Sequence, residues 1–155
     1  MTIAYRPGGT DDLEAVMDVM GRAFDPAFGE AWNRGQCLGI MALPDVVLCV
    51  AAADQDGSIV GFALSRMLLD DAELLLLAVD PTQRQRGIGA GLIEQAATWA
   101  RARGATRLLL EMRDGNAAGA LYENCGFDRI GRRPNYYRGN DGVQFDALTL
   151  ALPLS

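Results

Sequence analysis

The stretch from residue 73 to residue 112 constrains the fold more than any other part of this chain. Residues 73–79 form a largely apolar run of strand length that ends at Asp80-Pro81. Over residues 88–100 the apolar side chains recur at helical spacing, and a second apolar run follows at 107–112. A strand, a helix and a strand in this order predict a parallel pair of strands joined by a right-handed crossover.

The rest of the chain extends this pattern into an α/β (α+β) domain. Thr10 is a candidate N-cap for the first helix. We expect further strands at 2–6, 46–53, 59–66, 127–131 and 143–150, and further helices at 13–24, between 27 and 41, and at 116–124. Neither an internal repeat nor a linker interrupts the 155 residues, so we predict a single domain over residues 1–155.

The basic side chains limit the chemistry that this chain can perform. All 14 of them are arginine, and the sequence has no lysine and no histidine. A Ser-His-Asp or Cys-His catalytic unit, a lysine Schiff base and a histidine metal site are therefore excluded, and we expect no metal. A general base must be Asp, Glu, Tyr, Cys or a water molecule that one of them holds.

Charge is divided unevenly along the chain. Residues 1–80 hold 13 acidic and 4 arginine side chains, a charge of −9, whereas residues 81–155 hold 7 acidic and 10 arginine side chains, a charge of +3. This division suits an anionic ligand in the second half and a cationic partner at the first, although solvated helix faces that differ by chance are the simpler alternative. The acidic candidates for contact with a cationic partner are Asp25, Glu30, Asp70, Asp71 and Glu73. The net charge of −6 disfavours nucleic acid as a partner.

Cysteine usage and apolar runs bear on the cellular compartment. Cys37, Cys49 and Cys125 are widely scattered and form no Cys-x-x-Cys pair, so we expect reduced core thiols in a cytoplasmic protein. The apolar runs are too short to span a bilayer. The first residues lack a basic segment followed by a long apolar stretch, so we expect no signal peptide.

The loop that opens the helix at 88–100 is the most informative motif. Residues 84–90 read Arg-Gln-Arg-Gly-Ile-Gly-Ala. The two glycines let successive amide groups point at one spot, and the helix N-terminus adds its dipole there. Arg84 and Arg86 can neutralise charge beside that spot. The motif predicts a phosphate cradle, and a plain helix-capping turn is the alternative.

This loop resembles the acyl-CoA signature R/Q-x-x-G-x-G/A of the GNAT acetyltransferases. Further segments resemble later motifs of the same family: 77–81, 110–113, Asn116, 121–122 and 126–127. Arg132-Arg133, Tyr136-Tyr137 and the segment 146–148 resemble in particular its ribosomal-protein-alanine N-acetyltransferase group. The resemblance is strong over residues 60–150 and weak over 1–59.

The resemblance implies the GNAT fold, a central mixed, mostly antiparallel sheet of about seven strands flanked by about four helices. It implies an enzyme that transfers acetyl directly from acetyl-CoA to an amine within a ternary complex. For the group named above, the acceptor is the N-terminal α-amine of a basic ribosomal protein that begins with alanine. An acetyltransferase of a small amine and a catalytically silent acyl-CoA-binding module remain alternatives, and the oligomeric state stays open.

The resemblance also assigns roles to matching positions. Glu111 matches the general base and Tyr122 the general acid. The contacts to acetyl-CoA fall on Leu77, Ala78, Val79, Arg84, Gln85, Arg86, Gly87, Ile88, Gly89, Ala90 and Asn116. The sequence departs from the family at two points. The spacing from Asn116 to Tyr122 is one residue shorter than usual, and Ala90 stands where the family often has Arg or Lys.

Each of these side chains also has a simpler interpretation. Glu111 could be a strand-end carboxylate paired with Arg113 or Arg132. Tyr122 could be an aromatic packing residue of a short helix. The pair Tyr136-Tyr137 is a candidate for acceptor recognition, and its alternative is an ordinary β-strand edge.

Overall fold

A computed structural model describes residues 2–84 and 86–154 of the chain. Its strands form one sheet in the order β1-β2-β3-β4-β5-β7-β6. They are β1 (Ile3–Pro7), β2 (Val46–Ala53), β3 (Ile59–Leu68), β4 (Asp71–Val79), β5 (Arg107–Arg113), β6 (Asp128–Arg138) and β7 (Gln144–Pro153). The α-helices are α1 (Leu13–Ala23), α2 (Arg34–Met41), α3 (Ile88–Ala102) and α4 (Gly119–Asn124). The predicted mixed, mostly antiparallel sheet is confirmed, since β4–β5 is the one parallel pair among the described strands.

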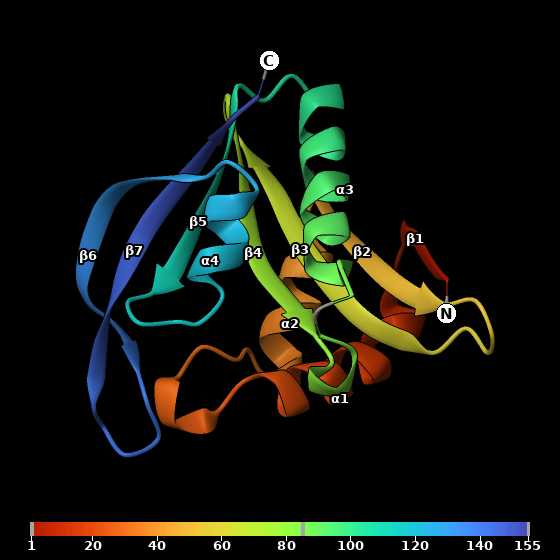
Figure 1. The fold of residues 1–155 in the computed structure, drawn as a ribbon, viewed down its shortest axis with the longest axis horizontal. Helices are drawn as coiled ribbons and strands as arrows, with labels where there is room; N and C mark the ends of the chain where they lie inside the picture. The colour runs from red at the N-terminus through yellow and green to blue at the C-terminus, as the bar shows by residue number, and fades with distance from the viewer. Residues whose placement is uncertain (1, 85, 155) are drawn as a thin grey trace.

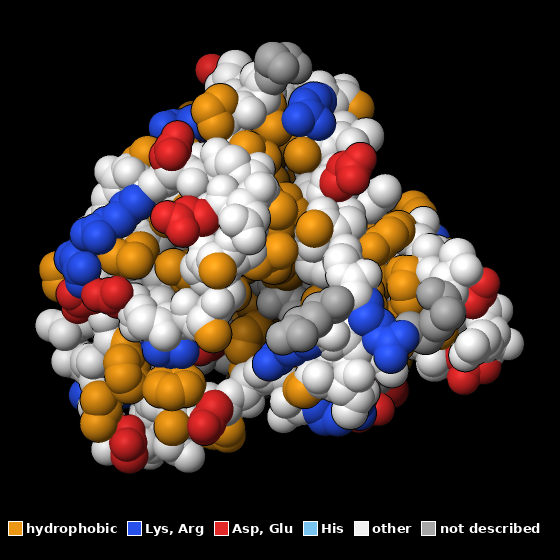
Figure 2. All heavy atoms as spheres, in the orientation of Figure 1, with side chains coloured by type: hydrophobic (Ala, Val, Ile, Leu, Met, Phe, Trp, Pro, Cys, Tyr) orange, Lys and Arg blue, Asp and Glu red, His pale blue; other side chains and the backbone are white. Residues whose placement is uncertain are grey.

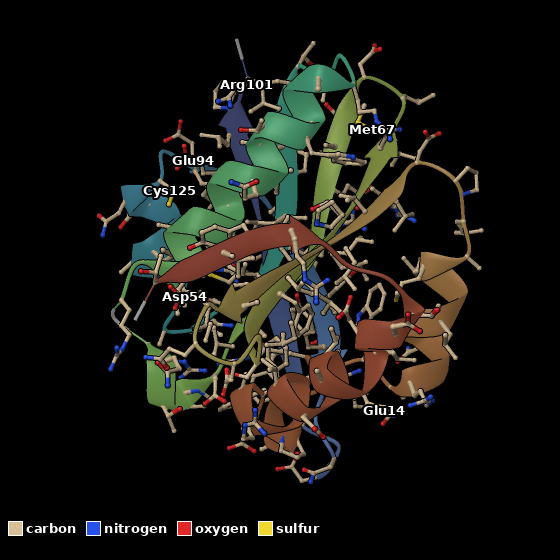
Figure 3. The ribbon with its side chains drawn as sticks, turned by 90° about the vertical axis from the view of Figure 1, so that its right-hand side faces the viewer. Glu14, Asp54, Met67, Glu94, Arg101 and Cys125 are labelled. Carbon is tan, nitrogen blue, oxygen red and sulfur yellow. The ribbon has the colours of Figure 1, made fainter. Side chains whose placement is uncertain are left out.

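The helices cover both faces of the sheet (Figure 1). Side chains of α3 and α4 pack into one buried apolar layer, which includes Leu92 and Leu108. Side chains of α1 and α2 pack into a second layer on the opposite face, which includes Val19 and Phe62. Figure 3, turned by 90°, shows the sheet between the two layers, with Glu94 on α3 and Glu14 on α1 at opposite sides. Both amphipathic helix sets therefore bury their apolar stripes against the same sheet.

A bulge in β4 determines where the sheet opens. The register with β3 pairs Ser65 with Leu74 and Leu64 with Leu76, so Leu75 is an extra residue in β4. An extra residue reverses the alternation of side chains and bends the strand. Accordingly Leu74 packs in the layer under α3, whereas Leu76 packs in the layer under α1. The pairing of β4 with β5 ends at Leu74 and Leu110, so the two strands separate at the bulge.

Strand β6 is longer than the sequence predicts. It runs to Arg138 rather than ending near residue 131. A central strand would exclude Pro134, because proline cannot donate a ladder hydrogen bond. β6 lies at the edge of the sheet, and its register with β7 is irregular between Arg133 and Tyr137, where the proline lies. The longer strand places both tyrosines of the predicted pair in β6.

Two helix starts also differ from the expectation. Thr10 is not the N-cap of α1, because it lies inside a 3₁₀ turn over Thr10–Asp12. Asp12 occupies the N-cap position of α1, and its carboxylate closes the preceding 3₁₀ turn by accepting a hydrogen bond from the amide of Gly9 at 3.0 Å. Helix α4 begins at Gly119 rather than 116, because the side chain of Asn116 accepts a hydrogen bond from the amide of Ala118 at 2.8 Å and forms a turn first.

The cysteines are free thiols within the described residues; Cys37 is buried in the core, whereas Cys49 and Cys125 are only partly buried. Burial raises the pKa of Cys37, of Cys49 and of Cys125. In the described parts of the chain, each helix is too short or too polar to cross a membrane.

Candidate active site

A cavity of about 700 Å³ opens where β4 leaves β5. Its walls come from β4, the end of β5, the loop before α3, the first turns of α3 and α4, the loop after α1, and Tyr137 of β6. Figure 2 shows the surface hollowed between these elements, with arginine side chains beside the hollow. Because the cavity passes through the sheet at the bulge, it touches the α3 side and the α1 side of the molecule.

The open edge of β4 forms one wall. Beyond Leu74, β4 pairs with β3 only, within the strands that the structure describes. The predicted residues Leu77, Ala78 and Val79 line the cavity along this edge. Backbone amide and carbonyl groups on that side are available to a ligand that lies in the opening. The predicted role of this segment thus has a matching geometry.

The N-terminus of α3 points its free amides at the same cavity. Gly87 is the N-cap residue with φ +77°, a left-handed conformation that glycine adopts without cost. The first four amides of a helix have no partner inside it and attract anions. Gly89 lies close to α4, because a Cβ there would be 2.8 Å from Cδ2 of Leu121. Gly87, Ile88 and Gly89 all line the cavity, so the structure brings the predicted cradle to the open edge of β4.

Of the other residues predicted in this loop, some line the cavity and some do not. Arg84 lines the cavity, and its Nη2 donates a hydrogen bond to the carbonyl of Ala23 at 3.3 Å. Arg86 and Ala90 are exposed and are not among the described residues of the cavity wall. Gln85 lies outside the described residues.

Glu111 lies on the cavity wall with both carboxylate oxygens in contact. The hydroxyl of Thr149 donates to Oε2 at 2.7 Å, and Nε of Arg133 lies 2.9 Å from Oε1. The hydroxyl of Tyr137 donates to the backbone carbonyl of Glu111 at 3.1 Å. Neither Arg113 nor Arg132 is the cation beside this carboxylate, so the alternative interpretation of Glu111 does not hold in that form.

Tyr122 lies in α4, buried, on the same cavity wall. Its ring meets that of Phe127 edge-on, with centroids 5.7 Å apart, so the packing interpretation is also correct. Burial raises the pKa of the Tyr122 hydroxyl well above its ordinary value, and the charge of Glu30 adds to the rise. The phenol therefore keeps its proton throughout the neutral range, as a proton donor must.

A buried ion pair holds the loop after α1 to the end of β5. Oε1 of Glu30 lies 3.1 Å from Nε of Arg113, and both side chains are about a tenth exposed. Nδ2 of Asn116 donates to Oε2 of Glu30 at 2.7 Å. The guanidinium of Arg113 lies 3.7 Å from the ring centroid of Phe28. No sequence pattern links residues 30, 113 and 116, and only the tertiary structure brings them together.

Only some of the residues predicted for acceptor recognition line the cavity. Tyr137 lines the cavity, whereas Tyr136 is half-exposed on the sheet edge. Of the acidic candidates, Asp25 and Glu30 line the cavity. Asp71 and Glu73 pair with arginines at the other end of β4. These four acidic candidates therefore do not all lie on the cavity wall.

A sequence model described as the Acetyltransferase (GNAT) family matches residues 13–127. This chain belongs to that family. Ribosomal protein bS18-alanine N-acetyltransferase of Salmonella typhimurium is 42% identical over 147 residues, which cover 94% of each chain. The enzyme of the same name from Escherichia coli is 42% identical over 102 residues, 65% of this chain and 68% of that one. The crystal structure of the ribosomal-protein-S18-alanine N-acetyltransferase from Escherichia coli superposes with a TM-score of 0.86 at 33% identity, covering 99% of this chain and 95% of that one.

The protein is thus an N-acetyltransferase that uses acetyl-CoA. The cavity residues fit that cosubstrate. The free amides at the start of α3 suit a pyrophosphate, Arg84 adds a positive charge, and the open edge of β4 suits the amide groups of a pantetheine arm. Among residues 2–84 and 86–154, no group of three or more His, Cys, Asp or Glu side chains is placed to hold a metal ion.

The left-handed conformation of Gly87 gives a stability prediction. Gly87→Ala is expected to lower the free energy of unfolding by about 1 kcal/mol, because an L-residue pays that conformational cost while a Cβ there meets no neighbour. Gly21→Ala, in the last turn of α1 and equally free of neighbours, is the control and is expected to raise the free energy of unfolding by about 0.4–1 kcal/mol. Urea denaturation of both variants measures the difference. Effects of the same sign would contradict the conformation of Gly87.

The buried ion pair gives a second stability prediction. Glu30→Ala leaves the Arg113 guanidinium buried without its counter-ion, so the free energy of unfolding is expected to fall by about 3–5 kcal/mol. Glu14→Ala removes an exposed pair with Arg34 on the surface of α1 (Figure 3) and is expected to change it by less than about 1 kcal/mol. Denaturant unfolding of the two variants, side by side, tests this. Equal losses would mean that the Glu30 pair contributes no more than a surface pair.

Proposed function

We propose that this chain, as a single domain over residues 1–155, acetylates the N-terminal α-amine of a basic ribosomal protein that begins with alanine, in the cytoplasm. The observation that carries the proposal is that Glu111 and Tyr122 line one cavity at the point where β4 leaves β5. The 42% identity over 94% of both chains with an enzyme named for ribosomal protein bS18 supports the choice of acceptor.

The acceptor amine sets a modest demand on the base. An N-terminal α-amine has a pKa of about 7.7–8.0, against about 10.4 for a lysine side chain, so roughly a tenth of such amines are neutral near pH 7. A carboxylate that accepts the proton lost by the amine nitrogen, directly or through water, is then a sufficient base. Glu111 takes this role. The hydroxyl of Thr149 holds one oxygen of its carboxylate, and Glu111 lines the cavity that opens at the edge of β4.

Tyr122 is the proton donor of the proposal. Bound acetyl-CoA would supply an activated thioester, and a thiol leaving group has a pKa of about 8.5. A neutral phenol in the cavity can give its proton to that sulfur. The amide of Val79, which lines the cavity at the open β4 edge, is proposed to donate to the thioester carbonyl.

The transfer is proposed to be direct, from thioester to amine. An acyl-enzyme route would need an activated cysteine. Cys125 follows α4 but is not among the described residues of the cavity wall, and burial raises the pKa of its thiol rather than lowering it. Both observations favour a ternary complex.

The cofactor contacts divide into backbone and side-chain groups. The amides at Gly87–Gly89 are proposed to hold the pyrophosphate, with Arg84 on the wall and Arg86 exposed on the same loop. Asn116 is among the residues that the family resemblance implies as contacts to acetyl-CoA. Its amide oxygen already accepts from Ala118 and its nitrogen donates to Glu30, so we assign it chiefly to positioning the start of α4.

The acceptor side of the cavity is lined by Phe28, Asp25, Glu30 and Tyr137. The loop after α1 and the hairpin between β6 and β7 meet there, because the amide of Asn140 donates to the carbonyl of Pro26 at 3.2 Å. The carboxylate of Asp25 and the phenol of Tyr137 suit a cationic, hydrogen-bonding chain terminus.

Turnover tests the assigned roles. With an alanine-starting, arginine-rich peptide and acetyl-CoA, Glu111→Gln is expected to lower kcat by roughly 10²–10⁴, and Tyr122→Phe by roughly 10². Thiol release gives the rates, and calorimetry shows whether CoA still binds. Glu123→Gln, an exposed carboxylate on the same helix as Tyr122, is the matched control and should retain the wild-type rate. Unchanged rates in Glu111→Gln and Tyr122→Phe would overturn the assignments, and acetylation of small amines alone would overturn the acceptor.

The pH profile tests the proton donor. kcat/KM for the peptide is expected to rise with pH as the α-amine loses its proton near pH 8. Burial raises the pKa of Tyr122, and a raised pKa moves deprotonation to higher pH, so the acid stays protonated and the rate should form a plateau up to about pH 10. A fall in kcat/KM between pH 8 and 9 that Tyr122→Phe abolishes would contradict this.

A further inference from the structure

The two partners of the Glu111 carboxylate differ in how firmly they are held. Thr149 is directly opposite Glu111 in the register of β5 and β7, so its hydroxyl is fixed by the sheet itself. Arg133 reaches Glu111 from the edge strand β6, and its side chain is 63% exposed. An exposed ion pair of this kind contributes little and breaks easily.

Arg133 is the cation on this carboxylate because of strand alternation. Its neighbour Arg132 projects to the other face of β6, where it pairs with Asp114 at 2.9 Å and Asp146 at 2.7 Å. Arg113, two residues beyond Glu111, is committed to Glu30. Among the described residues, Arg133 is therefore the cation in contact with Glu111.

The guanidinium of Arg133 has a second place to go. Its central carbon already lies 5.8 Å from the ring centroid of Tyr136, which is half-exposed beside it. Movement toward that ring exchanges an ion pair for a cation–π contact and needs no change in the backbone.

Resting on the proposed function, we propose that Arg133 is a displaceable counter-ion of Glu111 and that Thr149 is the positioning residue for the same carboxylate. The acceptor amine, in its neutral form, takes the Oε1 position that Arg133 occupies at rest. Its nitrogen forms the C–N bond to the acetyl carbon as the C–S bond of the thioester breaks. One N–H bond breaks as one O–H bond forms on Glu111, and Tyr122 gives its proton to the leaving sulfur. Glu111 then releases its proton to water, Tyr122 takes one from water, and Arg133 returns.

The proposal gives opposite signatures for the two residues. Displacement of Arg133 is part of acceptor binding, so Arg133→Gln removes a competitor and lowers the KM for the acceptor, with kcat nearly unchanged. Thr149 acts only through Glu111, so Thr149→Val lowers kcat and leaves KM nearly unchanged. A residue that merely stabilised the fold would not divide the two parameters in this way.

The Arg133 arm measures KM and kcat for the alanine-starting peptide by thiol release. Arg133→Gln is expected to lower KM by up to about fivefold, the factor that a surface ion pair of about 1 kcal/mol corresponds to. Arg133→Lys, which keeps a cation, should restore a KM near that of the wild type. Arg129→Gln, an exposed arginine on the same strand, controls for net charge and should change neither parameter. An unchanged or higher KM in Arg133→Gln overturns the displacement.

The Thr149 arm compares two substitutions of similar size. Thr149→Val is expected to lower kcat roughly tenfold, because it removes a hydrogen bond to a charged group, and Thr149→Ser should restore most of the rate. In combination with Glu111→Gln, Thr149→Val should cost nothing further. A fully active Thr149→Val, or a loss that is additive with Glu111→Gln, overturns the positioning role.

Failure of the proposed acceptor can be distinguished from failure of the roles proposed for Arg133 and Thr149. If the wild type does not acetylate the peptide, the proposed acceptor is wrong. The same comparison with the small amine that the wild type acetylates fastest then decides the roles of Arg133 and Thr149.

Discussion

The separation of β4 from β5 after Leu74 is the constraint on which the site depends. Parallel strands that stayed paired along their length would satisfy their backbone groups with each other and leave no opening. The extra residue Leu75 bends β4 away, while β5 remains paired with β7 over its whole length. One strand therefore offers a free backbone edge, and the other holds Glu111 in a fixed register opposite Thr149. The chain leaves β4 at Asp80 and reaches α3 within a few residues, so the anion-attracting end of that helix lies at the same opening.

A second, long-range contact shapes the other side of the cavity. The Glu30–Arg113 pair ties the loop after α1 to the end of β5, and Asn116 joins it through Glu30. Phe28 also meets Phe145 of β7 edge-on, at 5.5 Å between ring centroids. Asn116 in turn fixes the turn before α4 and, through it, the position of Tyr122. The loop, the strand end and the short helix are thus one connected unit rather than three independent contributors.

The absence of histidine and lysine is compatible with this chemistry because neither cofactor binding nor proton transfer needs these residues. Phosphate groups can be held by backbone amides and arginine, and an α-amine is weakly basic enough for a carboxylate to serve it. The charge division along the sequence explains less. Asp71 and Glu73 pair with arginines and do not line the cavity, and Glu30 neutralises Arg113. Among the described residues, Asp25 is therefore the acidic candidate on the wall that pairs with no arginine, and its carboxylate accepts a hydrogen bond from the amide of Ala27.

The sequence by itself determined the elements whose causes are local. The apolar run at 73–79, the helical spacing at 88–100 and the glycines at 87 and 89 predicted β4, α3 and the cradle between them, because period and backbone freedom act within a few residues. Family motifs added Glu111 and Tyr122, and both line the cavity. The full length of β6 was missed, because Pro134 is tolerated only at a sheet edge, and the edge is a property of strand order.

Only the tertiary structure decided which residues meet. The bulge at Leu75 lies in an unbroken apolar run, so no change of pattern marks it. Arg132 and Arg133 are identical neighbours in the sequence, yet strand alternation sends one to Asp114 and Asp146 and the other to Glu111. Glu30 forms its ion pair with Arg113, which lies 83 residues away in the sequence. Such contacts depend on the register and order of strands, which are set by the packing of the whole sheet rather than by any local segment.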